Sequence, residues 1–261
     1  MKLHSQLLTS LVILAIAGAQ NVNAQDADSL KRITGGKNTI KVNLTSIPLG
    51  NYSFQYERAI GKKVSLAVGY NFRKESELPF KSSLESLIDD EDTWDQLGSL
   101  KTGFSAITPE IRFYMGKGVC KGFYLAPFAK FATYKAKLPS FEYTFEENIN
   151  GQDVSKTEQI PLAGDIKTVT GGLMLGAQWK LSKLFYLDWW ILGPNYGTSK
   201  GSISGTKSLT EDEQKGLSEE LEDLEIPLVD SKTTVDSKGA RMEFSGPWAG
   251  ARAGISLGIR F

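Results

Sequence analysis

Residues 246–261, GPWAGARAGISLGIRF, decide the fold of this chain. From position 249 onward the odd positions are all apolar: Ala249, Ala251, Ala253, Ile255, Leu257, Ile259 and Phe261. The even positions carry glycine, serine and arginine: Gly250, Arg252, Gly254, Ser256, Gly258 and Arg260. Successive side chains of a β-strand point to opposite faces, and a tilted strand of about ten residues crosses a bilayer. The stretch therefore predicts a transmembrane β-strand with one lipid-facing side.

The same alternation recurs in seven earlier stretches of the chain. In each of them apolar side chains alternate with polar, charged or glycine residues, at positions 38–49, 52–57, 64–73, 105–115, 123–134, 169–181 and 185–192. Pro109 requires a bulge or a local break in the hydrogen-bond ladder of its strand. We expect Phe123 and Phe131 to face outward, because the opposite phase turns Lys130 towards lipid. Eight strands are therefore expected.

The connections between these strands fall into two groups by length. Three are long, at 74–103, 135–165 and 197–245, and they alternate with brief turns. Outer-membrane barrels have an even number of antiparallel strands, short periplasmic turns and longer extracellular loops. The sequence thus predicts an all-β fold, an eight-stranded antiparallel up-and-down transmembrane β-barrel over residues 38–261. Both termini are expected on the periplasmic side.

Two of the long connections show further patterning. Residues 141–145, FEYTF, and the turn signal Asn150-Gly151 indicate that the fifth and sixth strands continue outside the membrane as a hairpin. Residues 208–211, SLTE, resemble a capping box and precede an acidic, helix-like run to Leu224. The loops therefore contain some structure of their own.

A soluble lipocalin-like barrel is the alternative fold, with its apolar side chains facing inward around a ligand. The polar face here carries long charged residues such as Arg112 and Asp188, interleaved with glycines such as Gly172 and Gly176. Small residues beside long ones suit a narrow, filled interior, whereas a water-facing surface has little use for so many glycines. The membrane barrel is the preferred interpretation.

The front of the chain has the features of a secretory signal peptide. Lys2 is followed by an apolar run from Leu7 to Ala17 and by Val22-Asn23-Ala24, which places small residues before a cleavage site after Ala24. We expect residues 1–24 to be the signal peptide and 25–37 to be a short periplasmic lead-in.

Composition excludes several classes of function. The chain has 30 basic and 30 acidic residues, and this neutral balance disfavours nucleic-acid binding. Its one histidine, His4, is removed with the signal peptide, which excludes Ser-His-Asp triads and histidine metal sites from the mature protein. Cys120 is the one cysteine, so no intramolecular disulfide forms. We expect neither a metal nor a cofactor.

Three stretches carry a resemblance to a known family. They are 41–73, the segment TPEIRFY at 108–114, and LDWWILGPNYG at 187–197. The chain is similar in architecture to small barrels of the OmpA/OmpX type, and it resembles an uncharacterised barrel family common in Bacteroidota that carries a domain of unknown function. The resemblance implies an outer-membrane location and no assigned activity. Phe261 resembles the terminal aromatic residue that the barrel-assembly machinery reads.

Charged residues on the inward face must pair with one another, because an unpaired buried ion costs several kcal/mol. We expect a lumen network of Glu57, Glu110, Arg112, Lys130, Gln178, Lys180, Asp188 and Arg252. Side chains fill most of the space inside an eight-stranded barrel, so an open pore is not expected. The alternative role of the network is a gate that passes ions or small solutes.

The long loops carry more acidic than basic residues and are the candidate binding surface. They favour a non-enzymatic role in envelope structure or surface interaction, although paired loop carboxylates such as those of Asp89 and Asp92 are a formal acid–base alternative. Acidic loops near anionic lipopolysaccharide are suited to divalent cations or to a basic partner, but they lack the spacing of a calcium loop. Expected partners are outer-membrane lipid and lipopolysaccharide, the barrel-assembly machinery, and a surface or envelope protein.

Overall fold

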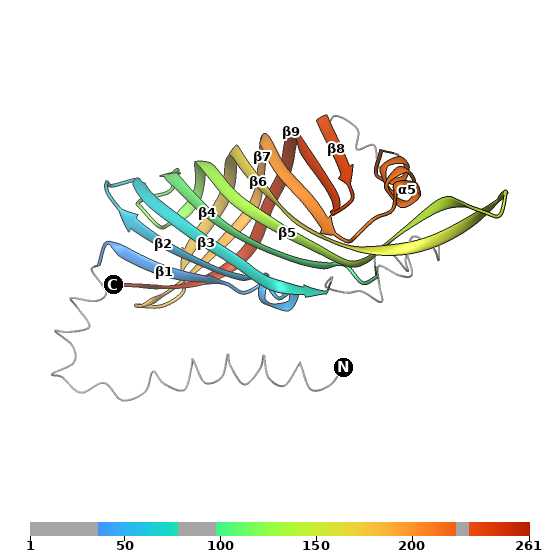
Figure 1. Cartoon of the computed structure of the whole chain (residues 1–261). Helices are drawn as coiled ribbons and strands as arrows, with labels where there is room; N and C mark the ends of the chain where they lie inside the picture. The colour runs from blue at the N-terminus through green and yellow to red at the C-terminus, as the bar shows by residue number, and fades with distance from the viewer. Residues whose placement is uncertain (1–35, 78–97, 223–229) are drawn as a thin grey trace, which may run out of the picture.

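The computed structural model describes residues 36–77, 98–222 and 230–261. Eight antiparallel strands follow one another around a ring, in the order β1 (Asn38–Asn43), β2 (Tyr52–Ala59), β3 (Val64–Glu77), β4 (Lys101–Tyr114), β5 (Gly122–Ile149), β6 (Gln152–Lys180), β7 (Phe185–Thr206) and β9 (Gly239–Arg260). β1 pairs with β9 and closes the ring (Figure 1). The predicted all-β, eight-stranded up-and-down barrel is confirmed. The signal peptide, its cleavage at Ala24 and most of the lead-in lie outside the described residues.

Side chains alternate between the two sides of the barrel wall as the sequence pattern predicts. In β2 every second residue is buried, and the residues between them are exposed. The exposed set is rich in large apolar side chains, such as Leu66, Ile107, Leu173 and Ile259, while the buried set contains Thr, Ser, Gln, Glu and Arg. The polarity is therefore the reverse of a lipocalin: polar groups lie inside and apolar groups outside.

The side chains of β5 face the sides of the wall that the sequence analysis predicts. Phe123, Leu125 and Phe131 are exposed on β5, whereas Tyr124 and Phe128 are buried. Pro109 on β4 is paired with Val68 of β3. On its other side the ladder to β5 passes from the pair Ile107↔Phe131 to the pair Glu110↔Phe128 with no change of register. The interruption accommodates the proline, which has no N–H to donate.

Several strands extend far beyond the length that a bilayer needs. β5 and β6 have 28 and 29 residues, and their pairing continues to Ile149↔Gln152, which confirms the predicted hairpin. The hairpin projects past the end of the barrel that lies away from the C-terminus (Figure 1). The expected loop at 197–245 is wrong at both ends, because β7 and β9 stay paired up to Thr206↔Gly239. Backbone hydrogen bonds pair these parts of β7 and β9. Such pairing does not require apolar and polar residues to alternate, so the sequence pattern did not reveal it.

The remaining part of that connection is a helix and a ninth strand. α5 (Glu211–Glu222) is preceded by a capping box in which the Thr210 N–H donates to Glu213 Oε2 at 2.7 Å and the Glu213 N–H donates to Thr210 Oγ1 at 3.3 Å. The box thus lies two residues later than the predicted one at 208–211, because Leu209 is buried ahead of the helix. β8 (Asp230–Asp236) pairs with the N-terminal part of β9, residues 239–245. None of the helices in the described ranges is both long and apolar enough to span a membrane.

Two buried clusters support this architecture. One lies inside the barrel and includes Tyr114, Tyr124, Met174 and Trp190. The other lies where the strands extend beyond the barrel. Its members come from the β5–β6 hairpin, from α5 and the residue Leu209 ahead of it, and from β9: Phe141, Tyr143, Phe145, Ile160, Leu162, Leu209, Leu217, Leu221, Ala240 and Met242. We call the part of the chain around this second cluster the hairpin–helix unit. Parts of two of the expected loops, 135–165 and 197–245, therefore form a small packed body, whereas residues 78–97 of the third expected loop, 74–103, lie outside the described residues.

The seam between β1 and β9 includes a backbone pair between Asn38 and Phe261 at one end. The Phe261 N–H donates to the Asn38 carbonyl at 2.8 Å, and the Asn38 N–H donates to the Phe261 carbonyl at 2.9 Å. The Phe261 side chain is exposed on the apolar outer surface. The residue thus holds the outermost rung of the closing ladder.

We predict that deletion of Phe261 lowers the fraction of correctly closed barrel. The deletion removes two hydrogen bonds, each of which contributes about 0.5–1.5 kcal/mol, together with an interfacial aromatic ring. Heat-modifiable migration on SDS gels measures the closed fraction. Phe261→Tyr is the control and should close normally; normal closure of the deletion variant would contradict the prediction.

Candidate functional site

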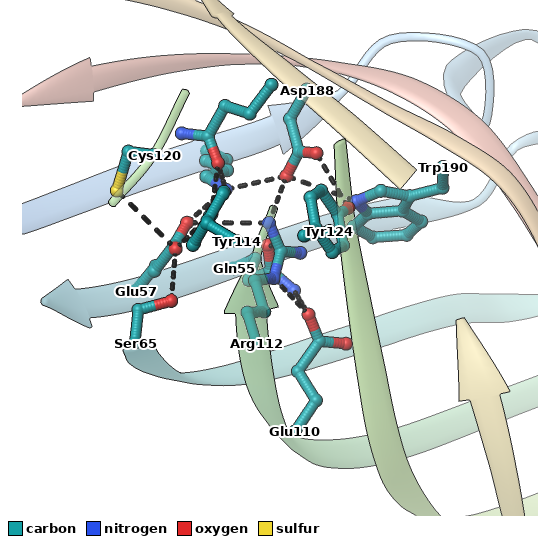
Figure 2. Close-up of polar contacts among 12 residues, drawn as sticks. Gln55, Glu57, Ser65, Glu110, Arg112, Tyr114, Cys120, Tyr124, Asp188 and Trp190 are labelled. Carbon is teal, nitrogen blue, oxygen red and sulfur yellow. Dashed lines mark hydrogen bonds and ion pairs between the residues drawn. The ribbon is translucent and has the colours of Figure 1, made fainter. Parts of the chain in front are cut away.

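Charged side chains from five strands meet inside the barrel, near the end where the strands are joined by brief turns. Lys41 comes from β1, Glu57 from β2, Glu110 and Arg112 from β4, Asp188 from β7 and Arg252 from β9. Figure 2 shows Arg112 at the centre, with Glu110, Glu57 and Asp188 around it. All six are buried, and Glu57, Arg112 and Asp188 have no exposed surface. We call this group, with its hydrogen-bonding partners, the lumen network.

Arg112 contacts all three carboxylates of the lumen network. Its Nη1 lies 2.6 Å from Asp188 Oδ2 and 3.4 Å from Glu57 Oε2, and its Nε lies 2.6 Å from Glu110 Oε1. Its remaining nitrogen, Nη2, donates to Gln55 Oε1 at 2.7 Å. A guanidinium suits this position because its donors form a rigid planar fork that addresses several acceptors at once.

Lys41 is the second cation of the lumen network. Its ammonium group donates to Glu57, to Asp188 at 2.6 Å and to Gln178 Oε1 at 3.1 Å. These three acceptors use the three donors of the group. Arg252 is the third cation and lies 3.0 Å from Glu110 Oε2. Three cations thus face the three carboxylates of Glu57, Glu110 and Asp188, and the group is neutral as a whole.

Neutral donors satisfy the remaining carboxylate oxygens. Tyr114 and Ser65 donate to Glu57 Oε1. Tyr124 donates to Asp188 Oδ1 at 2.8 Å, and the Trp190 indole N–H lies 3.2 Å from Asp188 Oδ2. A buried ion pair stabilises a fold only when such extra hydrogen bonds complete it. Each of these two carboxylates is saturated in that way.

Aromatic rings fill the space around the cations, and glycines make room for the rings. The Arg112 guanidinium lies 4.4 Å from the centre of the Tyr124 ring, and that of Arg252 lies 4.8 Å from the Trp190 ring. A Cβ at Gly176 would come within 2.3 Å of the Tyr124 ring, so no larger residue fits at that position. The inward glycines expected from the sequence therefore serve packing.

The lumen network contains most of the residues predicted for it, but not all. Six of the eight lie in it: Glu57, Glu110, Arg112, Gln178, Asp188 and Arg252. Lys130 lies elsewhere, because its ammonium group donates to the Tyr134 hydroxyl at 2.9 Å. Lys180 is exposed, because it is the last residue of β6 and lies where the wall ends and its side chain reaches solvent. The inclusion of both lysines was wrong.

The prediction missed several members of the lumen network, among them Lys41, Gln55, Tyr114 and Tyr124. Lys41 left the clearest signal, because it is the one charged residue of β1 and lies on its polar face between Thr39 and Asn43. Charge balance was a second signal. The predicted set has four cations and three anions, whereas the observed one has three of each.

Cys120 lies in the turn between β4 and β5 and is buried beside the lumen network. Its Sγ lies 3.6 Å from Glu57 Oε1. Burial raises the pKa of the Cys120 thiol to about 11, so the reactive thiolate is scarce at neutral pH. A buried thiol with a raised pKa is chemically unreactive, so Cys120 is a passive residue in this turn. Across the described ranges, no group of three His, Cys, Asp or Glu residues is placed to hold a metal ion.

The fold and the lumen network define a closed eight-stranded β-barrel whose interior holds a buried network of ion pairs. The chain belongs to the family described as "Protein of unknown function (DUF3575)", whose model matches residues 10–198. This confirms the resemblance to a barrel family of unknown function. Among the curated proteins, no match is found.

The chain is similar to several solved structures, three of which follow. CarO of Acinetobacter baumannii is 14% identical, with a TM-score of 0.39, and the match covers 87% of this chain and 98% of CarO. CarO2 of the same organism is 13% identical, with a TM-score of 0.38 and coverage of 82% and 98%. The N-terminal β-barrel domain of Pseudomonas aeruginosa OprF is 11% identical, with a TM-score of 0.24 and coverage of 86% and 96%.

We predict that Asp188→Asn destabilises the barrel by about 3–5 kcal/mol, the usual cost of removing one partner from a buried ion pair. The substitution keeps the shape of the side chain but leaves Lys41 and Arg112 with one buried carboxylate fewer. Urea unfolding in lipid vesicles measures the loss. Lys180→Gln is the control and should change stability by less than about 0.5 kcal/mol, because that side chain is exposed. Equal effects of the two substitutions would contradict the assignment.

Proposed function

We propose that the protein is a non-enzymatic outer-membrane β-barrel that displays the hairpin–helix unit at the cell surface for interaction with a partner. The observation that carries the proposal is the second apolar cluster. It is built from Phe141, Tyr143 and Ile160 of the hairpin together with Leu217 and Leu221 of α5, all buried. A barrel that served only to span a membrane would need no second core outside it.

The polarity of the wall supports the outer-membrane placement. Large apolar side chains cover the outer surface on all eight strands, from Ile40 on β1 to Ile259 on β9. In water such a surface would be a strong aggregation hazard, because monomeric soluble proteins rarely expose apolar patches larger than a few hundred Å². Aromatic residues such as Trp179 and Phe113 are exposed near the turn end, where an interfacial girdle is expected. A barrel is also free of the open sheet edges that lipid does not tolerate.

Polar contacts fix α5 on the hairpin. Lys207 Nζ donates to the Tyr143 hydroxyl at 2.8 Å and to Glu158 at 3.1 Å, and it lies 3.6 Å from Glu213 of α5. The Tyr143 hydroxyl donates to Glu213 at 3.2 Å. Burial alone would raise the pKa of Glu213, but hydrogen bonds from Thr210 and Tyr143 hold it below its usual range. The unit therefore presents a defined surface.

The solvent side of α5 is acidic. Its exposed carboxylates are those of Glu211, Asp212, Glu219, Glu220 and Glu222, and they are accompanied by a single exposed lysine, Lys215. Such a face favours a basic partner, because complementary charge steers association and suppresses wrong partners. Outer-membrane lipid, lipopolysaccharide and the barrel-assembly machinery are further proposed partners, required by any barrel in this location.

We predict that Glu219→Gln combined with Glu220→Gln lowers the yield of a surface cross-linked partner severalfold. Chemical cross-linking of intact cells, followed by mass spectrometry, compares the variant with the native chain. The matched control is Glu142→Gln with Glu146→Gln, two exposed acids on the hairpin strand β5. Equal yields from all three proteins would refute the proposal that the acidic face of α5 binds the partner. Recovery of the native chain outside the outer-membrane fraction would refute the placement itself.

A narrow or gated channel is the second candidate. It is favoured by polar groups in the lumen that lack a partner within the described residues, among them Gln178 Nε2, Thr170 Oγ1 and Asn195 Nδ2. Such groups suit contact with a passing solute. Against it, the lumen network crosses the interior and its central side chains are wholly buried.

We predict that the native barrel shows no conductance steps in planar bilayers, because the lumen network leaves no continuous path. Arg252→Gln should behave in the same way or show brief openings, since Arg252 is the cation of the network with the most exposed surface, at 8%. Glu110→Gln is the companion variant, because Glu110 is the carboxylate that Arg252 contacts. Stable steps from the native protein would favour the channel over the closed barrel.

A further inference from the structure

Lysines gather on the outward face of three neighbouring strands, just beyond the apolar part of the wall. They are Lys135 on β5, Lys167 on β6 and Lys200 on β7, all exposed. The strand pairing brings Lys167 directly opposite Lys200. Lys135 lies one rung further from the membrane, opposite Asp165. We call these three residues the lysine rim.

The spacing along the strands places the lysine rim at the height of lipid headgroups. Twelve residues separate Lys167 from Trp179, an exposed aromatic residue at the other edge of the apolar belt on β6. At about 3.3 Å per residue and a tilt of about 45°, this corresponds to roughly 28 Å along the barrel axis. The hydrocarbon core of a bilayer is about 30 Å thick. Lys135 lies twelve residues from Phe123, an exposed aromatic residue on β5.

The pair Lys167–Lys200 is unfavourable unless something binds it. Like charges directly opposite each other on one face of a sheet destabilise it. Within the described residues, no carboxylate forms an ion pair with either lysine, and neither ammonium group makes a hydrogen bond. The neighbouring carboxylate of Asp165 lies opposite Lys135 and Ser202 instead. The Lys135 ammonium group lies 3.8 Å from the Glu75 carboxylate. The two positive charges of the lysine rim that lack an ion pair within the described residues are therefore those of Lys167 and Lys200.

The surroundings of the pair supply the other features of a lipid site. Val169 and Tyr196 lie on the membrane side of the lysines and are 53% and 67% exposed, so acyl chains have an apolar surface to cover. Beside Lys200 is a polar groove of about 450 Å³. Its lining includes Lys232, Arg241 and Ser202, as well as the carboxylates of Asp230 and Glu243. A phosphorylated sugar headgroup fits such a mixed surface better than a bare phosphate does.

We propose that Lys167 and Lys200 together bind a phosphate group of a phosphorylated glycolipid in the outer leaflet, with its sugars towards the polar groove and its acyl chains over Val169 and Tyr196. The two ammonium groups match the charge of −1.5 to −2 that a phosphate monoester carries at neutral pH. This inference rests on the proposed outer-membrane placement. It is independent of the acidic surface of α5.

Native mass spectrometry of the full chain in mild detergent tests the inference, with lipid A as the probe. Lys167→Gln with Lys200→Gln should weaken lipid A binding about tenfold or more, because each cation near a charged lipid surface contributes appreciably. The matched control is Lys62→Gln with Lys63→Gln, two exposed lysines in a turn at the opposite end of the barrel. This control should bind lipid A as the native chain does, and binding by the native chain should weaken as salt is raised.

Three outcomes would overturn the inference. They are equal affinity of the native chain and the Lys167/Lys200 variant, equal loss in the Lys62/Lys63 control, and displacement of lipid A by millimolar inorganic phosphate, which would indicate a site for a free anion. Heat-modifiable migration is measured on every sample. If the Lys167/Lys200 variant forms a folded barrel in the outer-membrane fraction and binds lipid A as the native chain does, only this inference is refuted. If the native chain is absent from that fraction, the proposed placement is refuted.

Discussion

Arg112 reaches carboxylates on three strands, and the interior of the barrel depends on this contact. Its guanidinium contacts Glu110 on its own strand, Glu57 on β2 and Asp188 on β7. A wall that faces lipid on one side and a filled lumen on the other leaves little water to solvate a lone ion. Any charge inside must therefore be matched, and each lone pair must find a donor. Lys41 and Arg252 complete the balance, while Tyr114 and Tyr124 complete the hydrogen bonds.

This constraint also accounts for the small residues of the inner face and for the difference between the two ends. The rings that pack on the cations leave room only for glycine at positions such as Gly176. The filled end lies beside the brief turns, so few groups there are free to bind anything. At the other end the strands extend beyond the apolar part of the wall and form the hairpin–helix unit with its own apolar cluster. Under the proposed function, the lumen network and the interaction surface lie at opposite ends of one continuous sheet.

How far each feature could be predicted depends on the range of the contact that determines it. The side of the wall on which Arg112, Asp188 or Phe123 lies follows from parity along one strand, and the structure agrees with it. Lys180 obeys the same parity but is exposed, because its place at the end of β6 depends on where neighbouring strands stop. The capping box moved from Ser208 to Thr210 because burial of Leu209 against the hairpin sets the start of α5. Parity alone could not have placed either one.

The sequence by itself determined the eight strands of the ring, their direction and the face of the wall on which most of their side chains lie, because these follow from a period of two and from the lengths of connections. Only the tertiary structure decided which charges meet, since Lys41 and Asp188 are 147 positions apart and are brought together by closure of the ring. It also decided that the residues beyond the apolar belt form paired strands and a helix around a core. The physical reason is the same in both cases: pairing between distant segments depends on the relative positions of strands, and a local pattern does not contain that information.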